Sequence, residues 1–437
     1  LHLLSRRQRQ MCIRDSNRTI PLIRPLILQA GWAYNCYMKL PSEHIEDLDV
    51  KHHGIHLEGM RARSAERAAE RALAHNPLLV VSAVAALVTM FFVPPSIAYL
   101  DYFNWHTLAC LFSILVVIAA IDSSGLLEFV AHSLVQHVTS TRTLVIALVL
   151  ITLGCSMILS NDMTLIAVLP LALVLLKSVN RESEIPFAFI AITLTANFGG
   201  MLLPFSKPHN LYLYTVFGVS FGDFVAAMAP PLVLSVALIL VCCCFVKKAE
   251  FHYRKPESIQ VSKPRVAIYV VLFALCIAMT VGAVPFLMGM TVIVVVLAIT
   301  DRRVFAKTDY ALVMTFVCFF IFSGNIAQIP AISDFFSTVL DACGAFVTSL
   351  VSSQIINNVP SAILISHFSN DWAGIALGTN VGAVGTPISS LATLITLRQY
   401  QKSGLGSNGK FIARFEAYNF AFLVVVSLFE VFVMGIR

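Results

Sequence analysis

Charged side chains are scarce in this chain. Asp, Glu, Lys and Arg make up 12% of the 437 residues, whereas hydrophobic residues make up 58%, and the mean hydropathy is +0.81. Soluble domains carry about 25% charged residues, so this composition excludes an ordinary soluble protein. It predicts an integral membrane protein with several helical spans.

Motifs for several other kinds of chemistry are missing. The ten cysteines form no C-x-x-C pair, so neither a disulfide framework nor a metal site is predicted. The chain has no H-E-x-x-H motif and no evident Ser–His pair or pair of catalytic carboxylates, which intramembrane hydrolysis would need. We therefore predict that the protein is not an enzyme and holds no cofactor.

The first 76 residues contain 12 of the 30 Lys and Arg and read as a cytoplasmic tail. We expect this charge to flank the first span rather than to bind nucleic acid. No apolar segment with a small-residue cleavage site follows it, so no signal peptide is expected. The chain begins with Leu, and LLSRRQRQMCIRDS resembles translated adapter sequence. Residues 1–37 are therefore expected to be spurious, with a natural start at Met38 or Met60.

Long apolar runs are what the chain has in abundance. Some are continuous and predict simple spans, at 78–100, 105–121, 222–246, 266–284, 286–300, 311–327 and 411–436. Two others, 143–176 and 335–368, carry polar residues near their middles. We expect these two to form re-entrant hairpins, which return to the side they entered from, with tips at 160–162 and 357–358.

The stretches 186–217 and 372–397 are each interrupted by the same pattern, Asn-x-Gly-x-x-x-x-Pro. Its copies begin at Asn197 and Asn380. Gly and Pro open a helix, and in lipid such breaks survive only where they line a cavity within the protein. Paired interruptions in two halves of a chain point to the binding site of a secondary transporter.

The positions of Lys and Arg support one layout in the membrane. If the N-terminus lies in the cytoplasm and both hairpins are re-entrant, 16 of the 18 Lys and Arg after residue 75 lie on the inner side. The C-terminus then lies outside. The halves 77–246 and 286–437 become inverted copies, joined by the basic loop 247–265 and an extra helix at 266–285. The predicted fold is therefore an all-α polytopic membrane protein, an inverted-repeat transporter with two re-entrant hairpins and two broken transmembrane helices.

The hairpin tips and the helix breaks are expected to meet near the middle of the membrane. Half-helix N-termini attract anions there, and unwound carbonyl groups attract cations. Most side chains at these places are uncharged hydrogen-bonding groups, which suit a small polar solute. The predicted substrate- and ion-binding residues are Ser160, Asn161, Asp162, Thr164, Asn197, Gly199, Gly200, Ser206, Lys207, Asn210, Asn357, Asn358, Thr379, Asn380, Gly382, Thr386, Ser389 and Ser390.

Two of these residues are ionisable, which is costly at membrane depth and marks functional candidates. Asp162 and Lys207 could pair with each other, Lys207 could bind an anion, or Lys207 could replace a sodium ion held by a related carrier. A further set of carboxylates lies near predicted helix ends or on amphipathic stretches and is expected to be solvated. This set is Asp122, Glu128, Asp334, Asp341, Glu416 and Glu430.

Four ordered segments resemble the ion transporter superfamily, which includes citrate and dicarboxylate carriers, arsenite permeases and some sodium–proton antiporters. They are SNDMTLIAVLPLAL (160–173), ANFGGMLLPFSKPHN (196–210), INNVPSA (356–362) and TNVGAVGTPISSLAT (379–393). The resemblance covers about residues 78–436. It implies a two-hairpin inverted repeat, usually a homodimer, which moves its site by an elevator-like displacement.

The tips depart from the Ser-Asn-Thr of the sodium-coupled dicarboxylate branch, which weakens the case for sodium-dependent dicarboxylate uptake. Lys207 and His209 in the first break favour an anion. The leading hypothesis is a secondary carrier of a small anion in the cytoplasmic membrane, organic such as citrate or a dicarboxylate, or inorganic, coupled to Na⁺ or H⁺. The alternatives are an arsenite exporter or a sodium–proton antiporter, and, from another class, a membrane-embedded enzyme or a channel.

Overall fold

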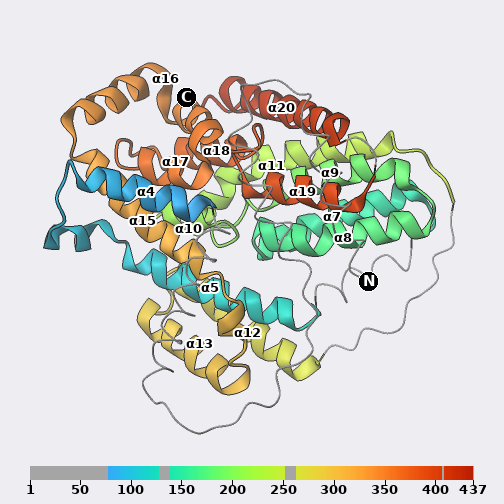
Figure 1. The fold of residues 1–437 in the computed structure, drawn as a ribbon, viewed down its shortest axis with the longest axis horizontal. Helices are drawn as coiled ribbons and strands as arrows, with labels where there is room; N and C mark the ends of the chain where they lie inside the picture. Colours follow the sequence, from blue (N-terminus) through green and yellow to red (C-terminus); the bar gives the residue numbers. More distant parts are fainter. Residues whose placement is uncertain (1–76, 127–137, 251–261, 406–407, 437) are drawn as a thin grey trace, which may run out of the picture. The chain divides into compact units, whose positions relative to one another are not determined.

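The computed structural model describes residues 77–126, 138–250, 262–405 and 408–436. Within these ranges the secondary structure is helical, apart from an isolated bridge between Ser140 and Glu250 (Figure 1). The predicted tail 1–76, most of the basic loop 247–265, and Glu128 lie outside the described residues.

Seven of the described helices are long and apolar enough to cross a membrane. They are α5 (Trp105–Ser123), α7 (Thr141–Ile158), α8 (Asn161–Ser178), α11 (Phe221–Cys244), α15 (Tyr310–Ala327), α16 (Pro330–Ile356) and α20 (Asn408–Phe432). Shorter apolar helices are α4 (Pro77–Met90), α12 (Lys263–Thr280) and α13 (Phe286–Thr300). The protein is therefore a polytopic all-helical membrane protein, as predicted.

The other described helices are shorter, and four of them flank the Asn-x-Gly motifs. These four are α9 (Ile185–Gly199), α10 (Pro208–Phe217), α18 (Trp372–Gly382) and α19 (Leu391–Ser403). The rest are η1 (Ile97–Tyr102), η2 (Glu182–Glu184), α14 (Val304–Lys307) and α17 (Asn358–Ile365). The same order of elements thus occurs twice: a helix pair, an interrupted helix and a long helix, first as α7 to α11 and then as α16 to α20.

The helices before each break are buried along nearly their whole length. α9 packs against α7, α8, α11 and α19, and α18 packs against α16, α17 and α10. In α18, Gly374, Gly378 and Gly382 recur at intervals of four, so they share one helical face. A Cβ atom on Gly378 would lie 2.4 Å from the carbonyl oxygen of Phe346 in α16. Small residues therefore allow the two backbones to approach closely, as is common between membrane helices.

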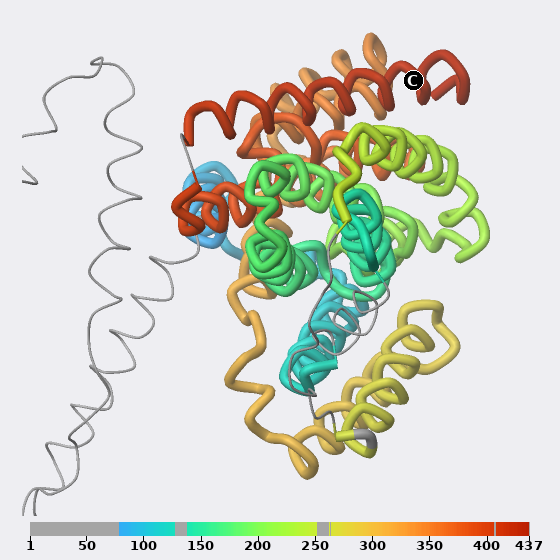
Figure 2. Tube along the Cα trace, turned by 90° about the vertical axis from the view of Figure 1, so that its right-hand side faces the viewer, coloured from blue at the N-terminus to red at the C-terminus, as the bar shows by residue number. Residues whose placement is uncertain are grey.

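Helices α4 and α15 pack together, and α12 and α13 both pack on α5. Figure 2 shows α12 and α13 (yellow) as a hairpin beside α5 (cyan). This group is separate in sequence from the helix pairs and interrupted helices that carry the predicted site.

Both predicted hairpin tips are places where one helix ends and the next begins. Leu159 and Ser160 are extended, and the Ser160 hydroxyl accepts a hydrogen bond from the Met163 N–H, which caps α8. At the second tip Asn357 has a φ of 79°, an uncommon conformation for a residue with a side chain. Its side-chain oxygen accepts from the Val359 N–H and its amide donates to the Ile388 carbonyl, which together hold this strained conformation.

Candidate functional site

The two helix breaks are built by the same hydrogen bonds. In the first break the Ser206 hydroxyl contacts the carbonyl oxygens of Gly200 and Leu203. In the second break the Ser389 hydroxyl contacts the carbonyl oxygens of Ala383 and Thr386, at 3.1 and 2.7 Å. Counted from the motif Asn of each break, these serines and carbonyls occupy identical positions. The two breaks are therefore equivalent in structure as well as in sequence.

The residue that follows each of these serines is the N-cap of the next half-helix. It is Lys207 before α10 and Ser390 before α19. The Lys207 ammonium donates to Asn380 Oδ1 at 2.9 Å, and the Ser390 hydroxyl donates to Asn197 Oδ1 at 3.3 Å. Each N-cap thus contacts the motif Asn of the opposite break, so the two breaks lie against each other in a reciprocal arrangement.

The hairpin tips reach the same place. Asn161 Nδ2 donates to Asn197 Oδ1 at 3.2 Å, which joins the first tip to the first break. The Asn358 N–H donates to the Ser389 carbonyl at 3.3 Å, which joins the second tip to the second break. All four predicted segments therefore meet, through contacts that span up to 193 residues of sequence.

A cavity of about 170 Å³ lies where these segments meet. This is smaller than the roughly 300–1,000 Å³ of pockets for drug-sized ligands and fits a small solute. Predicted residues that line it are Ser160, Asn161, Asp162, Ser206, Lys207, Asn357, Asn358 and Ser390. Other residues of its wall are Leu78, Leu115, Met163, Ile166, Pro208, His209, Asp309, Leu312, Val359 and Leu391.

The ion pair that the sequence left open between Asp162 and Lys207 is not formed. Lys207 is 2% exposed and its ammonium is bound to Asn380, whereas Asp162 is half-buried in the cavity wall. Asn380 is held in turn by Asn210, whose Oδ1 accepts from Asn380 Nδ2 at 2.6 Å. The Lys207 ammonium has three N–H donors, so donors beyond the one bound to Asn380 remain for a ligand.

Several buried polar atoms at this cavity lack a hydrogen-bond partner. They are the side-chain oxygen Oδ1 of Asn161 and both ring nitrogens of His209, which lies beside Lys207 and Asn380. A buried polar atom without a partner costs about 1–3 kcal/mol. These atoms would gain partners from a polar solute or from water, as expected at a binding site.

Other predicted residues lie behind the cavity and support it. Asn197, Asn210 and Asn380 connect the segments, and a Cβ atom on Gly200 would lie 2.2 Å from Asn161 Oδ1. Four predicted residues serve the backbone or helix packing and are not among the residues that line the cavity. They are Gly199, Thr379, Gly382 and Thr386. Thr164, which is buried in α8, and Ser389 likewise do not line the cavity.

Sequence reasoning missed Gln354, which braces the second break. Its Nε2 donates to the Gly382 carbonyl at 2.6 Å and its Oε1 accepts from the Thr386 N–H at 2.9 Å. The signal was present, because Gln354 is a polar residue in an apolar run three positions before the tip Asn357. Asp309 and His209 in the cavity wall were likewise left out of the predicted set.

The expectation that Glu416 and Glu430 are solvated was wrong. Both carboxylates are buried, and neither has a hydrogen-bond partner among the described residues. Glu430 shares one face of α20 with Phe415, Phe422 and Val426, and this face packs toward α9, α11 and α18. By contrast Asp122, Asp334 and Asp341 are exposed, as predicted.

Comparison with known proteins agrees with this architecture. Residues 70–373 match the family model CitMHS, described as citrate transporter. The inner membrane protein YbiR of Escherichia coli is 30% identical over 342 residues, 74% of this chain and 86% of that protein. An uncharacterized transporter of Methanocaldococcus jannaschii is 28% identical over 300 residues, 68% of this chain and 81% of that protein.

The family match covers well over half of the chain. Together with the seven candidate spans, these similarities describe a transporter and not an enzyme. The chain belongs to the CitMHS citrate transporter family.

Proposed function

We propose that this protein is a secondary carrier of a small anion, with its binding site at the cavity between the two helix breaks. The observation that carries this proposal is the position of the Lys207 ammonium, a buried cationic donor in the cavity wall that is bound to the motif Asn380 of the opposite break. A charge-assisted hydrogen bond of this kind is roughly twice as strong as a neutral one and suits a carboxylate or an oxyanion.

The repeated order of elements supports transport by alternating access. If the two halves, 77–246 and 286–437, are inverted copies, α7–α8 and α16–α17 are re-entrant hairpins that enter from opposite sides. Exchange of conformation between the halves then turns an inward-open site outward. This layout places the N-terminus in the cytoplasm and the C-terminus outside, and the superfamily resemblance adds a homodimer with elevator-like movement.

The substrate class that we propose is a small organic anion such as citrate or a dicarboxylate. An inorganic anion is the alternative substrate to be tested in the same assay. The cavity wall offers side-chain amide donors from Asn161 and Asn358. Asp162 in the same wall would repel an anion unless a proton or Na⁺ neutralised it. Cotransport of one of these cations with the anion follows from that arrangement.

A second candidate, cation exchange or arsenite export, is favoured by a different observation. Two carboxylates, Asp162 and Asp309, line the cavity, against one ammonium. Paired carboxylates can exchange protons for Na⁺ without any anionic substrate. This candidate predicts that Asp309→Asn abolishes transport and that Lys207→Met has little effect.

Uptake into proteoliposomes separates the candidates. Purified protein would be reconstituted and given radiolabelled citrate, succinate or inorganic phosphate under an imposed Na⁺ or H⁺ gradient, with arsenite and Na⁺/H⁺ exchange measured in parallel. We expect gradient-driven uptake of one of these anions by the unchanged protein and its loss in Lys207→Met.

Lys410→Met is the matched control, because Lys410 is exposed and not among the residues that line the cavity. It should transport at the unchanged rate. Anion uptake that survives Lys207→Met would contradict the proposed site, and Na⁺/H⁺ exchange without anion uptake would establish the second candidate instead.

A further inference from the structure

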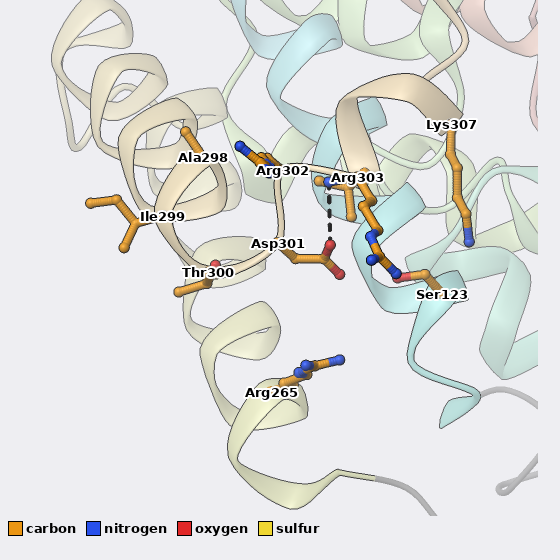
Figure 3. Close-up of a pocket in the computed structure, with 10 residues that line it drawn as sticks. Ser123, Arg265, Ala298, Ile299, Thr300, Asp301, Arg302, Arg303 and Lys307 are labelled. Atoms are coloured by element: carbon orange, nitrogen blue, oxygen red, sulfur yellow. Dashed lines mark hydrogen bonds between the residues drawn. The ribbon is translucent and has the colours of Figure 1, made fainter. Parts of the chain in front are cut away.

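A cavity of about 680 Å³, much larger than the one between the breaks, lies at the C-terminal end of α13. It is walled by the end of α5, the start of α12 and the turn that leads from α13 into α14 (Figure 3). It shares no residue with the cavity between the breaks. The residues that line it therefore need an explanation other than binding of the transported solute.

Positive charge dominates this cavity. Four basic side chains line it, namely Arg265, Arg302, Arg303 and Lys307. The cavity also holds one carboxylate, Asp301, which accepts a hydrogen bond from the Arg303 N–H at 3.3 Å and one from the Tyr269 hydroxyl at 3.2 Å. Figure 3 shows Asp301 inside the turn, with Arg265 approaching from α12.

Among the described residues, none of these four basic side chains forms an ion pair or a side-chain hydrogen bond, whereas the Asp301 carboxylate already accepts two hydrogen bonds. Arg guanidinium groups present several N–H donors in a planar fork that matches phosphate oxygens. The cavity is therefore suited to an anion that carries a phosphate group.

An apolar stripe leads along α13 to this cavity. Met288, Val292, Val295 and Ile299 follow one another at helical spacing, and all four are exposed, Ile299 to 80%. At 1.5 Å per residue the stripe is about 16 Å long, close to half of the roughly 30 Å hydrocarbon core of a bilayer. The stripe thus has the length of one leaflet's acyl chains and ends at the basic cavity.

We propose that this cavity binds the headgroup of an anionic phospholipid, whose acyl chains lie along the Met288–Ile299 stripe of α13. Basic pockets between membrane helices are known to take phosphate-bearing lipid headgroups. A soluble phosphate compound would contact the arginines alone, whereas a phospholipid bound at the cavity would also place its acyl chains on the apolar stripe that ends there. The combination of cationic cavity and apolar track therefore favours a lipid over a free anion.

The test is lipid retention, measured by native mass spectrometry of the full chain released from detergent micelles. The purified protein would be offered phosphatidylglycerol, phosphatidylcholine and inorganic phosphate separately. We expect retained phosphatidylglycerol, little phosphatidylcholine, and no displacement of the lipid by phosphate. Each basic residue near an anionic headgroup contributes about fivefold in affinity, so Arg302→Gln with Arg303→Gln should lower retention about 25-fold.

Lys247→Gln with Lys248→Gln is the matched control, since these two exposed, adjacent basic residues follow the end of α11 and do not line the cavity. It should leave retention unchanged. Equal retention of both lipids by the unchanged protein, an equal loss in the control, displacement by inorganic phosphate, or a second copy of the chain covering the stripe would each overturn the proposal. The lipid preference of the unchanged protein keeps the test decisive even if the double variant fails to fold.

Discussion

The two helix breaks, 199–208 and 382–391, share one scaffold and differ in the charge of the N-cap side chain that lines the cavity. The scaffold is the serine whose hydroxyl contacts two backbone carbonyls, at the same positions in each break. The difference is at the N-cap that follows, Lys207 in the first break and Ser390 in the second. Equivalent backbone geometry therefore presents a cation from one side of the cavity and a hydroxyl from the other.

This contrast distinguishes the residues that maintain the backbone of each break from the residues that bind a solute. Hydrogen bonds within a break can be repeated in both halves because they depend only on local backbone geometry. A charge cannot be repeated so easily, because two ammonium groups in one small cavity would repel each other. We infer that the shared serines are structural and that the N-cap asymmetry selects the solute.

Replacing the N-cap of the first break by that of the second should have the largest effect on anion uptake. Lys207→Ser would give both breaks the same N-cap, and Ser is a favourable residue at that position, so the protein should fold. An anion would then enter without its countercharge, and an uncompensated buried charge costs about 3–5 kcal/mol, which corresponds to a loss of roughly 150- to 4,000-fold in affinity. Anion uptake into proteoliposomes measures this loss.

Lys207→Arg serves as the control that keeps the charge, and it should retain part of the uptake. If Lys207→Ser transported anions as well as the unchanged protein does, the N-cap asymmetry would have no role in substrate choice.

The sequence located most of the helices and both breaks, because these depend on local patterns. The span expected at 78–100 was wrong, since α4 ends at Met90 and a separate 3-10 turn, η1 (Ile97–Tyr102), follows it. Apolar runs located α7, α8, α11 and α20 to within a few residues, and the Asn-x-Gly motifs located both interruptions. The polar residues at 160 and 357 likewise marked the ends of α7 and α16. Re-entrance and the inverted orientation of the halves remain predictions from charge placement.

The partners of individual side chains could not be predicted. Lys207 binds Asn380 rather than Asp162, a choice that depends on how two segments 173 residues apart pack. Glu430 is buried because its face of α20 packs against other helices. The sequence of α20 is equally compatible with that face being exposed. Such outcomes depend on tertiary packing, which periodicity in a single segment does not contain.

The next difference to test is that a glutamine side chain forms hydrogen bonds with the backbone of only one break. Gln354 holds the second break through the Gly382 carbonyl and the Thr386 N–H, and the equivalent position before the first break is Met157, which cannot donate a hydrogen bond to it. Gln354→Met should leave both backbone groups unpartnered and lower the free energy of unfolding by about 2–3 kcal/mol. Thermal unfolding in detergent measures the change.

Met157→Gln is the reciprocal variant, in a half-buried position. It should change the free energy of unfolding by only about 0.5 kcal/mol, since the first break holds without this brace. Equal destabilisation by the two variants would show that the breaks do not differ in this respect.

The shared serines should behave alike if the two breaks are equivalent. Ser206→Ala and Ser389→Ala each remove a buried hydroxyl that contacts two carbonyl oxygens. We expect each to lower the free energy of unfolding by about 1–2 kcal/mol, and the double variant to lose the sum, because the two hydroxyls share no partner. Thermal unfolding of the three variants checks this, and a large effect at one serine alone would contradict the equivalence.

The motif glycines provide the most specific comparison, because each tests how closely one helix pair packs. A Cβ atom on Gly382 would lie 2.9 Å from Ser353 Cβ and 3.0 Å from the Leu350 carbonyl oxygen, and neither atom can move without shifting α16. A Cβ atom on Gly199 would instead meet mainly the Ser156 hydroxyl at 2.2 Å, which can rotate about χ1.

Gly382→Ala should therefore cost about 1–3 kcal/mol of unfolding free energy, and Gly199→Ala about 1 kcal/mol less. Thermal unfolding of both variants, with Gly154→Ala as a control at a position where a Cβ atom meets nothing within 4 Å, measures the difference. Equal costs at Gly199 and Gly382 would mean that both helix pairs yield to the same extent. A greater cost at Gly382 would show that the second break is the more rigid of the two, in keeping with its additional brace from Gln354.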